Sequence, residues 1–146
     1  MRNVVVDTNV LVRAFLNRNN SDGRVFAKAI TGEIQLWYSR RLLEELLRVL
    51  SYPRLARYTI TREAIDAFIK MLMLHGKSIQ PQSTTLCRDP DDNEILGIAL
   101  ALVGSEPVYL ISADKDLLAL RNRIEGVTIL TPQEFLKGMP VGAKIR

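Results

Sequence analysis

Short apolar runs alternate along the chain with longer segments in which apolar residues recur every three or four positions. The runs at residues 4–6, 34–38, 108–111 and 127–130 contain β-branched and aromatic residues and predict strands. The longer segments between them predict helices. Strands that alternate with helices favour a parallel sheet with helices on both faces, so we expect an α/β fold, a three-layer α/β/α sandwich around a central parallel β-sheet.

The helix boundaries are predicted from capping residues, prolines and glycines. Thr8 or Asn9 is placed to cap the first helix, Ser39 opens the helix after the second strand, and Asp89 with Pro90 opens a helix that is apolar on nearly every side over 95–103. A basic connector is expected over 53–58, a polar loop over 17–23, and weak strand signals lie at 78–80 and 85–86. The expected helices cover 10–15, 25–30, 40–50, 61–74, 90–103, 114–120 and 132–136.

Composition favours one globular domain. The chain has 146 residues, of which 47% are apolar and 25% are charged, an ordinary balance for such a domain. We expect the domain to span residues 1–137 and residues 138–146 to form a flexible basic tail. The single cysteine, Cys87, forms no internal disulfide and suits a reducing compartment.

The apolar run at the N-terminus is not typical of a signal peptide, because Asp7, Asn9 and Arg13 interrupt it. Nothing in the sequence approaches the roughly 18 consecutive apolar residues of a membrane span. We therefore expect a cytoplasmic protein with no membrane segment.

The net charge of +4 and the pI of about 9.5 favour a polyanionic partner, although basic charge also serves solubility alone. The basic residues are concentrated between residues 40 and 62, with tyrosines among them. This stretch is a candidate nucleic-acid-binding face, and its arginines are Arg40, Arg41, Arg48, Arg54, Arg57 and Arg62.

Two aspartates follow predicted strands. Asp7 comes directly after the first strand, and Asp114 follows the strand at 108–111 with Ser112 and one further residue between them. If the strands are parallel, both carboxylates point into the same crevice, and Asp116 can turn toward it from the next helix. Helix capping explains Asp114 and Asp116 equally well when each is taken alone.

Two further segments supply acids. Asp89 is expected mainly as an N-cap, whereas Asp92 shares the apolar side of its helix and is directed inward. Glu44 and Glu45 lie on opposite borders of a leucine stripe, so helical geometry does not choose between them, and a solvated face is the default for both.

Several carboxylates at one sheet edge repel one another and need a counter-charge. His75, the only histidine, is expected to be exposed, so a histidine-based metal site is excluded. Mg²⁺ or Mn²⁺ prefers oxygen ligands and leaves positions for water and a substrate phosphate. The acids therefore predict a metal-dependent phosphodiester hydrolase.

Five segments in this order resemble the PIN-domain family, in particular toxins of toxin–antitoxin pairs. They are residues 5–12, 39–50, 88–93, 112–118 and 129–136. The resemblance implies an α/β/α fold and Mg²⁺- or Mn²⁺-dependent endoribonuclease activity. It also implies a homodimer and inhibition by a cognate antitoxin.

The same resemblance assigns roles residue by residue. It implies that Asp7, Glu45, Asp92 and Asp114 are the catalytic, metal-binding acids, which chooses Glu45 over Glu44. Asp116 is implied as an auxiliary metal-binding acid, and Asn9 or Ser112 as a supporting hydrogen-bonding residue.

Two other functions stay open at this point. One is a non-catalytic RNA-binding or protein-interaction module with the same fold. The other is a small-molecule phosphohydrolase of the haloacid dehalogenase type, which also has an aspartate after its first strand. That family expects a second aspartate two residues later, where this chain has Asn9.

Overall fold

Five parallel strands form the centre of the structure, a computed structural model that describes residues 1–52 and 60–138. The sheet has the strand order β3-β2-β1-β4-β5, and every neighbouring pair is parallel. The strands are β1 (Arg2–Val6), β2 (Ile34–Tyr38), β3 (Gly76–Ser78), β4 (Val108–Ile111) and β5 (Val127–Leu130).

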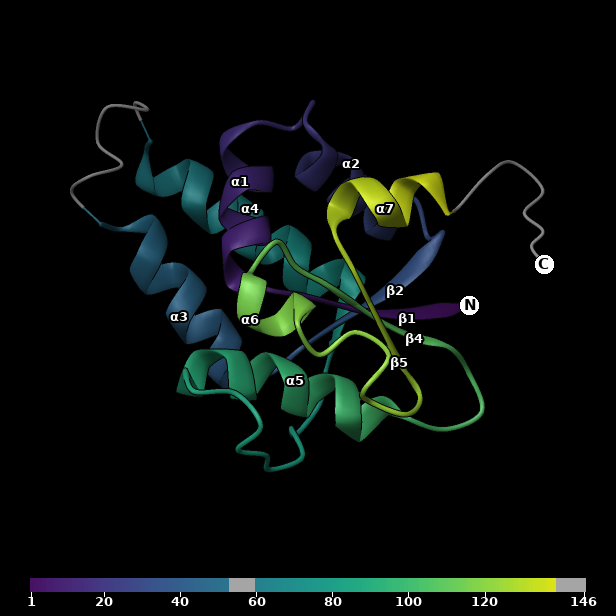
Figure 1. Ribbon diagram of the computed structural model, residues 1–146. Helices are drawn as coiled ribbons and strands as arrows, with labels where there is room; N and C mark the ends of the chain where they lie inside the picture. Colours follow the sequence, from purple (N-terminus) through teal and green to yellow (C-terminus); the bar gives the residue numbers. More distant parts are fainter. Residues whose placement is uncertain (53–59, 139–146) are drawn as a thin grey trace.

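Helices cover both faces of this sheet (Figure 1). On one face lie α1 (Thr8–Leu16), α2 (Ser21–Ile30), α4 (Arg62–His75) and α7 (Pro132–Lys137), and on the other lies α5 (Pro90–Leu102), which packs on β1 and β4. The helices α3 (Arg40–Leu50) and α6 (Lys115–Leu118) lie toward the carboxyl ends of the strands. The predicted three-layer α/β/α sandwich is confirmed.

The core explains the sequence pattern. Val4 and Val5 of β1 are fully buried because helices cover both faces of the central strand. In α5 the residues from Ile95 to Ala99 are buried, as the apolar surface of this helix predicts. Burial ends earlier than expected, since Val103 is 43% exposed.

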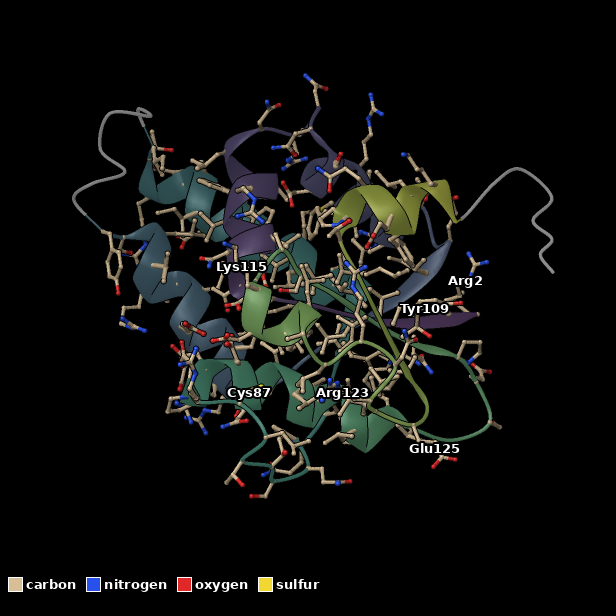
Figure 2. All side chains as sticks on the ribbon, viewed as in Figure 1. Arg2, Cys87, Tyr109, Lys115, Arg123 and Glu125 are labelled. Atoms are coloured by element: carbon tan, nitrogen blue, oxygen red, sulfur yellow. The ribbon has the colours of Figure 1, made fainter. Side chains whose placement is uncertain are left out.

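The amino ends of the strands carry none of the predicted site acids. There the guanidinium carbon of Arg2 lies 5.8 Å from the centre of the Tyr109 ring (Figure 2). Among the described residues, no helix is long and apolar enough to cross a membrane.

Three strands and several helix starts agree with the sequence prediction. The bounds of β2, β4 and β5 are as expected, and Ser39, Thr61 and Asp89 are N-caps. The predicted connector at 53–58, and the predicted tail after its first residue, lie outside the described residues.

Other boundaries were predicted wrongly. The first helix is capped by Asp7 and not by Thr8 or Asn9, because the Asp7 carboxylate accepts the Val10 N–H at 3.0 Å. The helix expected to start at residue 25 starts at Ser21, with Asn20 as its N-cap. The polar loop before it is correspondingly shorter than predicted.

The third strand and the helix α6 also differ from expectation. Residues 76–78 form a short edge strand paired with β2, so Gly76 starts a strand as well as ending a helix, and residues 85–86 are not a strand. The helix α6 ends at Leu118, because the following N–H groups of Leu120 and Arg121 bond three residues back and tighten the chain into turns.

Gly97 allows the segment before α5 to pack directly against this helix. A Cβ added at Gly97 would lie 2.3 Å from the carbonyl oxygen of Gln82. The Gln82 N–H donates to the Gly97 carbonyl oxygen at 2.9 Å, so the approach is fixed by a hydrogen bond.

We predict that Gly97→Ala lowers the free energy of unfolding by about 1–3 kcal/mol, because the overpacked methyl outweighs the better helix propensity of alanine. Urea unfolding measures the change. Gly104→Ala is the control, since a Cβ there meets only the Leu102 carbonyl oxygen at 3.8 Å, and it should change stability by less than about 0.5 kcal/mol. Equal effects in the two variants would contradict the packing explanation.

Candidate functional site

The register of the two central strands brings Asp7 and Ser112 together. Val6 and Ile111 are partners in the β1–β4 ladder, and the Asp7 N–H continues it by donating to the Ile111 carbonyl oxygen at 3.1 Å. The Ser112 hydroxyl then donates to Asp7 Oδ2, while Asp7 Oδ1 accepts the Val10 N–H. Asp7 is only 6% exposed. The hydrogen bonds from Ser112, after β4, and from Val10, in the first turn of α1, hold its carboxylate in one orientation.

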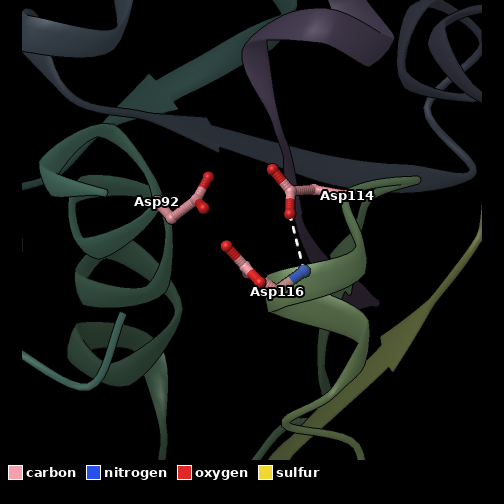
Figure 3. A group of neighbouring side chains, drawn as sticks. All are labelled: Asp92, Asp114 and Asp116. Carbon is pink, nitrogen blue, oxygen red and sulfur yellow. Dashed lines mark hydrogen bonds between the residues drawn. The ribbon is translucent and has the colours of Figure 1, made fainter. Parts of the chain in front are cut away.

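Asp114 and Asp116 come from the turn after β4 and the start of α6. The Ser112 hydroxyl accepts the Asp114 N–H at 2.9 Å, and Asp114 Oδ1 accepts the Asp116 N–H at 2.7 Å. Asp114 is therefore the N-cap of α6 and also faces Asp92 (Figure 3). Asp116 forms an exposed ion pair with Arg88, whose Nη2 lies 3.2 Å from Oδ1.

Asp92 approaches these acids from the first turn of α5. Asp89 caps this helix by accepting the Asp91 N–H at 2.9 Å, which turns the Asp92 side chain toward the sheet edge. Asp92 is 8% exposed, and its Oδ2 atom is buried without a hydrogen-bond partner among the described residues.

The helix α3 supplies Glu45. Glu45 Oε1 accepts the hydroxyl of the buried residue Thr8 at 3.0 Å, which ties α3 to the start of α1. Glu44, one residue earlier, is exposed and pairs with Arg40 at 3.2 Å. The structure thus points Glu45 and not Glu44 toward the other acids.

Most of these acids line one small cleft of about 190 Å³ at the carboxyl edge of the sheet. Carboxylate oxygens of Asp92, Asp114 and Asp116 lie within 4.8 Å of one another, and Figure 3 shows the three groups pointing into the same space. The residues that line the cleft are Asp7, Thr8, Asn9, Glu45, Asp89, Asp91, Asp92, Ile95 and Asp114.

Burial and neighbouring charges raise the pKa values of three of the cleft acids, Asp92, Asp7 and Glu45. Burial, followed by the charge of Asp114, raises the pKa of Asp92 to about 7. Burial raises the pKa of Asp7 and outweighs the hydrogen bonds from Ser112 and Val10, which lower it. The pKa of Glu45 is also raised, first by burial and then by the neighbouring Asp91 carboxyl.

The donor set fits a hard divalent cation. All the candidate ligand atoms are carboxylate oxygens, which Mg²⁺ and Mn²⁺ prefer over nitrogen or sulfur. The buried, unpartnered Oδ2 atom of Asp92 is explained if a cation is its partner. A bound cation would also offset the mutual repulsion that raises the Asp92 pKa.

The structure places the predicted site residues in three groups. Asp7, Asn9, Glu45, Asp92 and Asp114 share the cleft. Asp116 completes the close carboxylate group, and Ser112 lies behind Asp7 and bonds to it.

The predicted basic face is described only in part. Arg41 pairs with Asp91 at 3.5 Å, and Arg48 bonds to the Tyr52 hydroxyl. Arg62 pairs with Asp66 at 3.3 Å, and both residues lie on α4, a helix that contributes no residue to the lining of the cleft. Arg54 and Arg57 lie outside the described residues.

Three contributions were missed at the level of the sequence. Thr8 was considered only as a helix cap, yet it holds Glu45. Asp91 was not among the predicted site residues, but it lines the cleft and raises the Glu45 pKa. Arg88 neutralises Asp116 across 28 residues of sequence, a pairing that no local pattern could have signalled.

Comparison with known proteins places this site in a family. A family model described as "PIN domain" matches residues 3–116, a stretch that contains all the acids above. An uncharacterized protein of Methanocaldococcus jannaschii is 28% identical over 142 residues, which are 92% of this chain and 89% of that protein. The solved PIN domain of T. brucei RRP44 is 16% identical, with a TM-score of 0.45, and the match covers 92% of this chain and 79% of that one.

We predict that Asp92 makes the metal-free protein less stable at and above neutral pH than at acidic pH. Its pKa is about 7 in the folded state and about 3.9 when unfolded, so the stabilising protonated form is lost as the pH rises through 7. Asp92→Asn should abolish a loss on the order of 2 kcal/mol between pH 5 and pH 8.5.

Urea unfolding in EDTA at both pH values measures this difference. Asp66→Asn, a change at an exposed aspartate of α4, is the control and should keep the wild-type pH dependence. An unchanged pH dependence in Asp92→Asn would contradict the prediction.

Proposed function

The chain belongs to the PIN-domain family, and from this premise we propose that it is a metal-dependent endoribonuclease whose active site is the acidic cleft. PIN domains are generally metal-dependent nucleases. The observation that carries the proposal is the meeting of four acids from four separate segments, Asp7, Glu45, Asp92 and Asp114, in one cleft. Capping alone does not require these segments to turn their acids toward a common space.

Asp7, Asp92, Asp114 and Asp116 would hold Mg²⁺ or Mn²⁺, with Glu45 at the side of the cleft formed by α3. When bound, such an ion would stabilise the charge on a scissile phosphodiester and lower the pKa of the attacking water. The reaction would be direct hydrolysis by water, because no serine, cysteine or histidine lines the cleft and the hydroxyl of Thr8, which does, donates to Glu45.

The protein's own contribution is orientation and proton binding. Ser112 fixes Asp7 Oδ2, and Thr8 fixes Glu45 Oε1, so two carboxylates keep their positions before substrate arrives. The raised pKa of Glu45 suits it to accept a proton from water. Asn9 lines the same cleft and can hydrogen-bond but cannot carry a proton at neutral pH.

RNA is the proposed substrate because the chain carries a net charge of +4 although its cleft is acidic. The excess basic charge must therefore lie elsewhere on the surface, where it can bind the phosphates that flank the cleaved bond. Arg40 and Arg41, at the start of α3, and Arg48, near its end, are the described candidates on the helix that carries Glu45.

A toxin role in a toxin–antitoxin pair is the proposed biological setting. It is supported by the resemblance of the five sequence segments to PIN-domain toxins. In that setting the chain would act as a homodimer in the cytoplasm, and a cognate antitoxin would cover the cleft until RNA cleavage is needed.

We predict that the purified protein cleaves single-stranded RNA in Mn²⁺ and not in EDTA. Asp7→Asn and Asp114→Asn should each lower the rate by roughly 100-fold or more, since each removes a charge from the proposed ion site. The rates are measured from the cleavage of an end-labelled oligoribonucleotide.

Asp66→Asn and Glu63→Gln are matched controls on the exposed side of α4 and should cleave at the wild-type rate. Cleavage that persists in both Asp7→Asn and Asp114→Asn would contradict the proposed site. Metal-independent RNA binding without cleavage would instead favour a non-catalytic module, and turnover of nucleoside monophosphates alone would favour a small-molecule phosphohydrolase.

Expression of the chain in bacterial cells should slow growth, because uncontrolled RNA cleavage stops protein synthesis. Asp7→Asn should relieve the growth defect at equal protein level, whereas Asp66→Asn should not. Growth curves with immunoblots make the comparison. Equal growth arrest by the Asp7→Asn variant would show that the effect does not come from this site.

A further inference from the structure

A second and larger hollow lies beside the acidic cleft. Its volume is about 600 Å³, within the range of sites that enclose small organic ligands. It is bounded by the start of α3, the start of α5 and the segment 78–84 that follows β3.

The first turns of α3 and α5 form the wall between the two spaces. On α3, Glu45 lines the acidic cleft and its neighbour Glu44 lines the hollow. On α5, Asp91 and Asp92 line the cleft, whereas Glu94 lines the hollow. Since a helix with its side chains is about 10–12 Å across, the two spaces are separated by one or two nucleotides of an RNA chain.

The hollow is preformed, because backbone contacts fix the segment that closes it. The Ile79 N–H donates to the Tyr38 carbonyl oxygen at 3.0 Å, which holds the start of the segment to the end of β2. The Gln82 N–H donates to Gly97, and the absent side chain of Gly97 lets the segment lie against α5. A ligand would therefore meet a wall that is already in place.

The lining suits an uncharged polar ligand better than a phosphate. Arg40 and Arg41 are balanced by Glu44 and Glu94 on the same walls. The other polar groups are neutral amides and hydroxyls, and among the described residues the side chains of Gln80, Gln82 and Ser83 have no hydrogen-bond partner. Glutamine amides can donate and accept along the edge of a base, and a guanidinium plane can stack on its face.

Arg41 connects the two spaces. It lines the hollow and lies 3.5 Å from Asp91, which lines the cleft. The side chain of Arg41 is 57% exposed, so this weak ion pair leaves the guanidinium open to a passing RNA phosphate.

We propose that the hollow is a nucleoside subsite: it binds one base and its ribose, one or two nucleotides from the cleaved bond, while Arg41 binds the phosphate between the two spaces. This rests on the proposed ribonuclease function. It assigns substrate positioning to side chains outside the acid cluster, and predicts that cleavage depends on a base at one defined position.

The test is an abasic scan of a single-stranded oligoribonucleotide with one preferred cleavage site. Removal of the base at one position, within two nucleotides of the cleaved bond, should raise KM about tenfold and change kcat by less than about twofold. The doubly substituted variant Gln80→Ala/Gln82→Ala should lose this dependence, and Gln133→Ala, at an exposed glutamine of α7, should keep it. A flat scan with normal cleavage overturns the proposal, as does a peak that persists in the double variant.

Binding measured in EDTA separates this inference from the proposed chemistry. Arg41→Ala should weaken RNA binding about tenfold and lower the salt dependence by about one phosphate contact. Arg24→Ala is the control, because Arg24 lines a separate hollow formed by α2, the turn after it and Leu136 of α7. If binding depends on Arg41 and on the same abasic position but no cleavage occurs in Mn²⁺, the ribonuclease proposal fails and the subsite stands. If binding is indifferent to Arg41 and the two glutamines, the subsite fails and the hollow is left to another occupant, such as a protein segment.

Discussion

The fixed orientation of the Asp7 carboxylate is the constraint on which the site depends. Its two oxygens accept from groups on different elements, the hydroxyl of Ser112 after β4 and the N–H of Val10 in α1. The parallel register of β1 with β4 brings these donors to the same place. The hydrogen bonds that join the end of β1 to the end of β4 and to the start of α1 therefore also orient Asp7 in the cleft.

Other aspartates at the carboxyl edge of the sheet also cap a helix and line the cleft. Asp114 caps α6 with Oδ1, and Asp89 caps α5 so that Asp92 is turned inward. Capping and ion binding are thus not competing explanations, since a carboxylate can satisfy a helix N–H and still present oxygen to a cation. This arrangement has an electrostatic consequence: burial, and then the negative charge of Asp114 and the other nearby aspartates, raises the pKa of Asp92 to about 7.

The sequence predicted features that depend on local chemistry and failed where tertiary contacts decide. Four of the strands were visible from β-branched and aromatic runs, but β3 is built from Gly76, Lys77 and Ser78 and exists because it pairs with β2. Glu44 and Glu45 could not be separated by helical geometry, because only the Thr8 hydroxyl on another helix distinguishes them. Arg41 was expected on a basic face, whereas its place between the cleft and the larger hollow follows from how α3 packs beside α5.

The dispersion of the acids along the chain has a consequence for how the site forms. Asp7, Glu45, Asp92 and Asp114 lie on segments that meet only when β1 and β4 are paired and α3 and α5 are docked. A dehalogenase-type arrangement would place a second aspartate two residues after the one that follows the first strand, and this chain has Asn9 there. Ion binding would therefore be coupled to the completed fold and not to a local loop, because no single segment carries enough ligands. Folding would have to bring the acids together against their repulsion, and a bound cation would offset it.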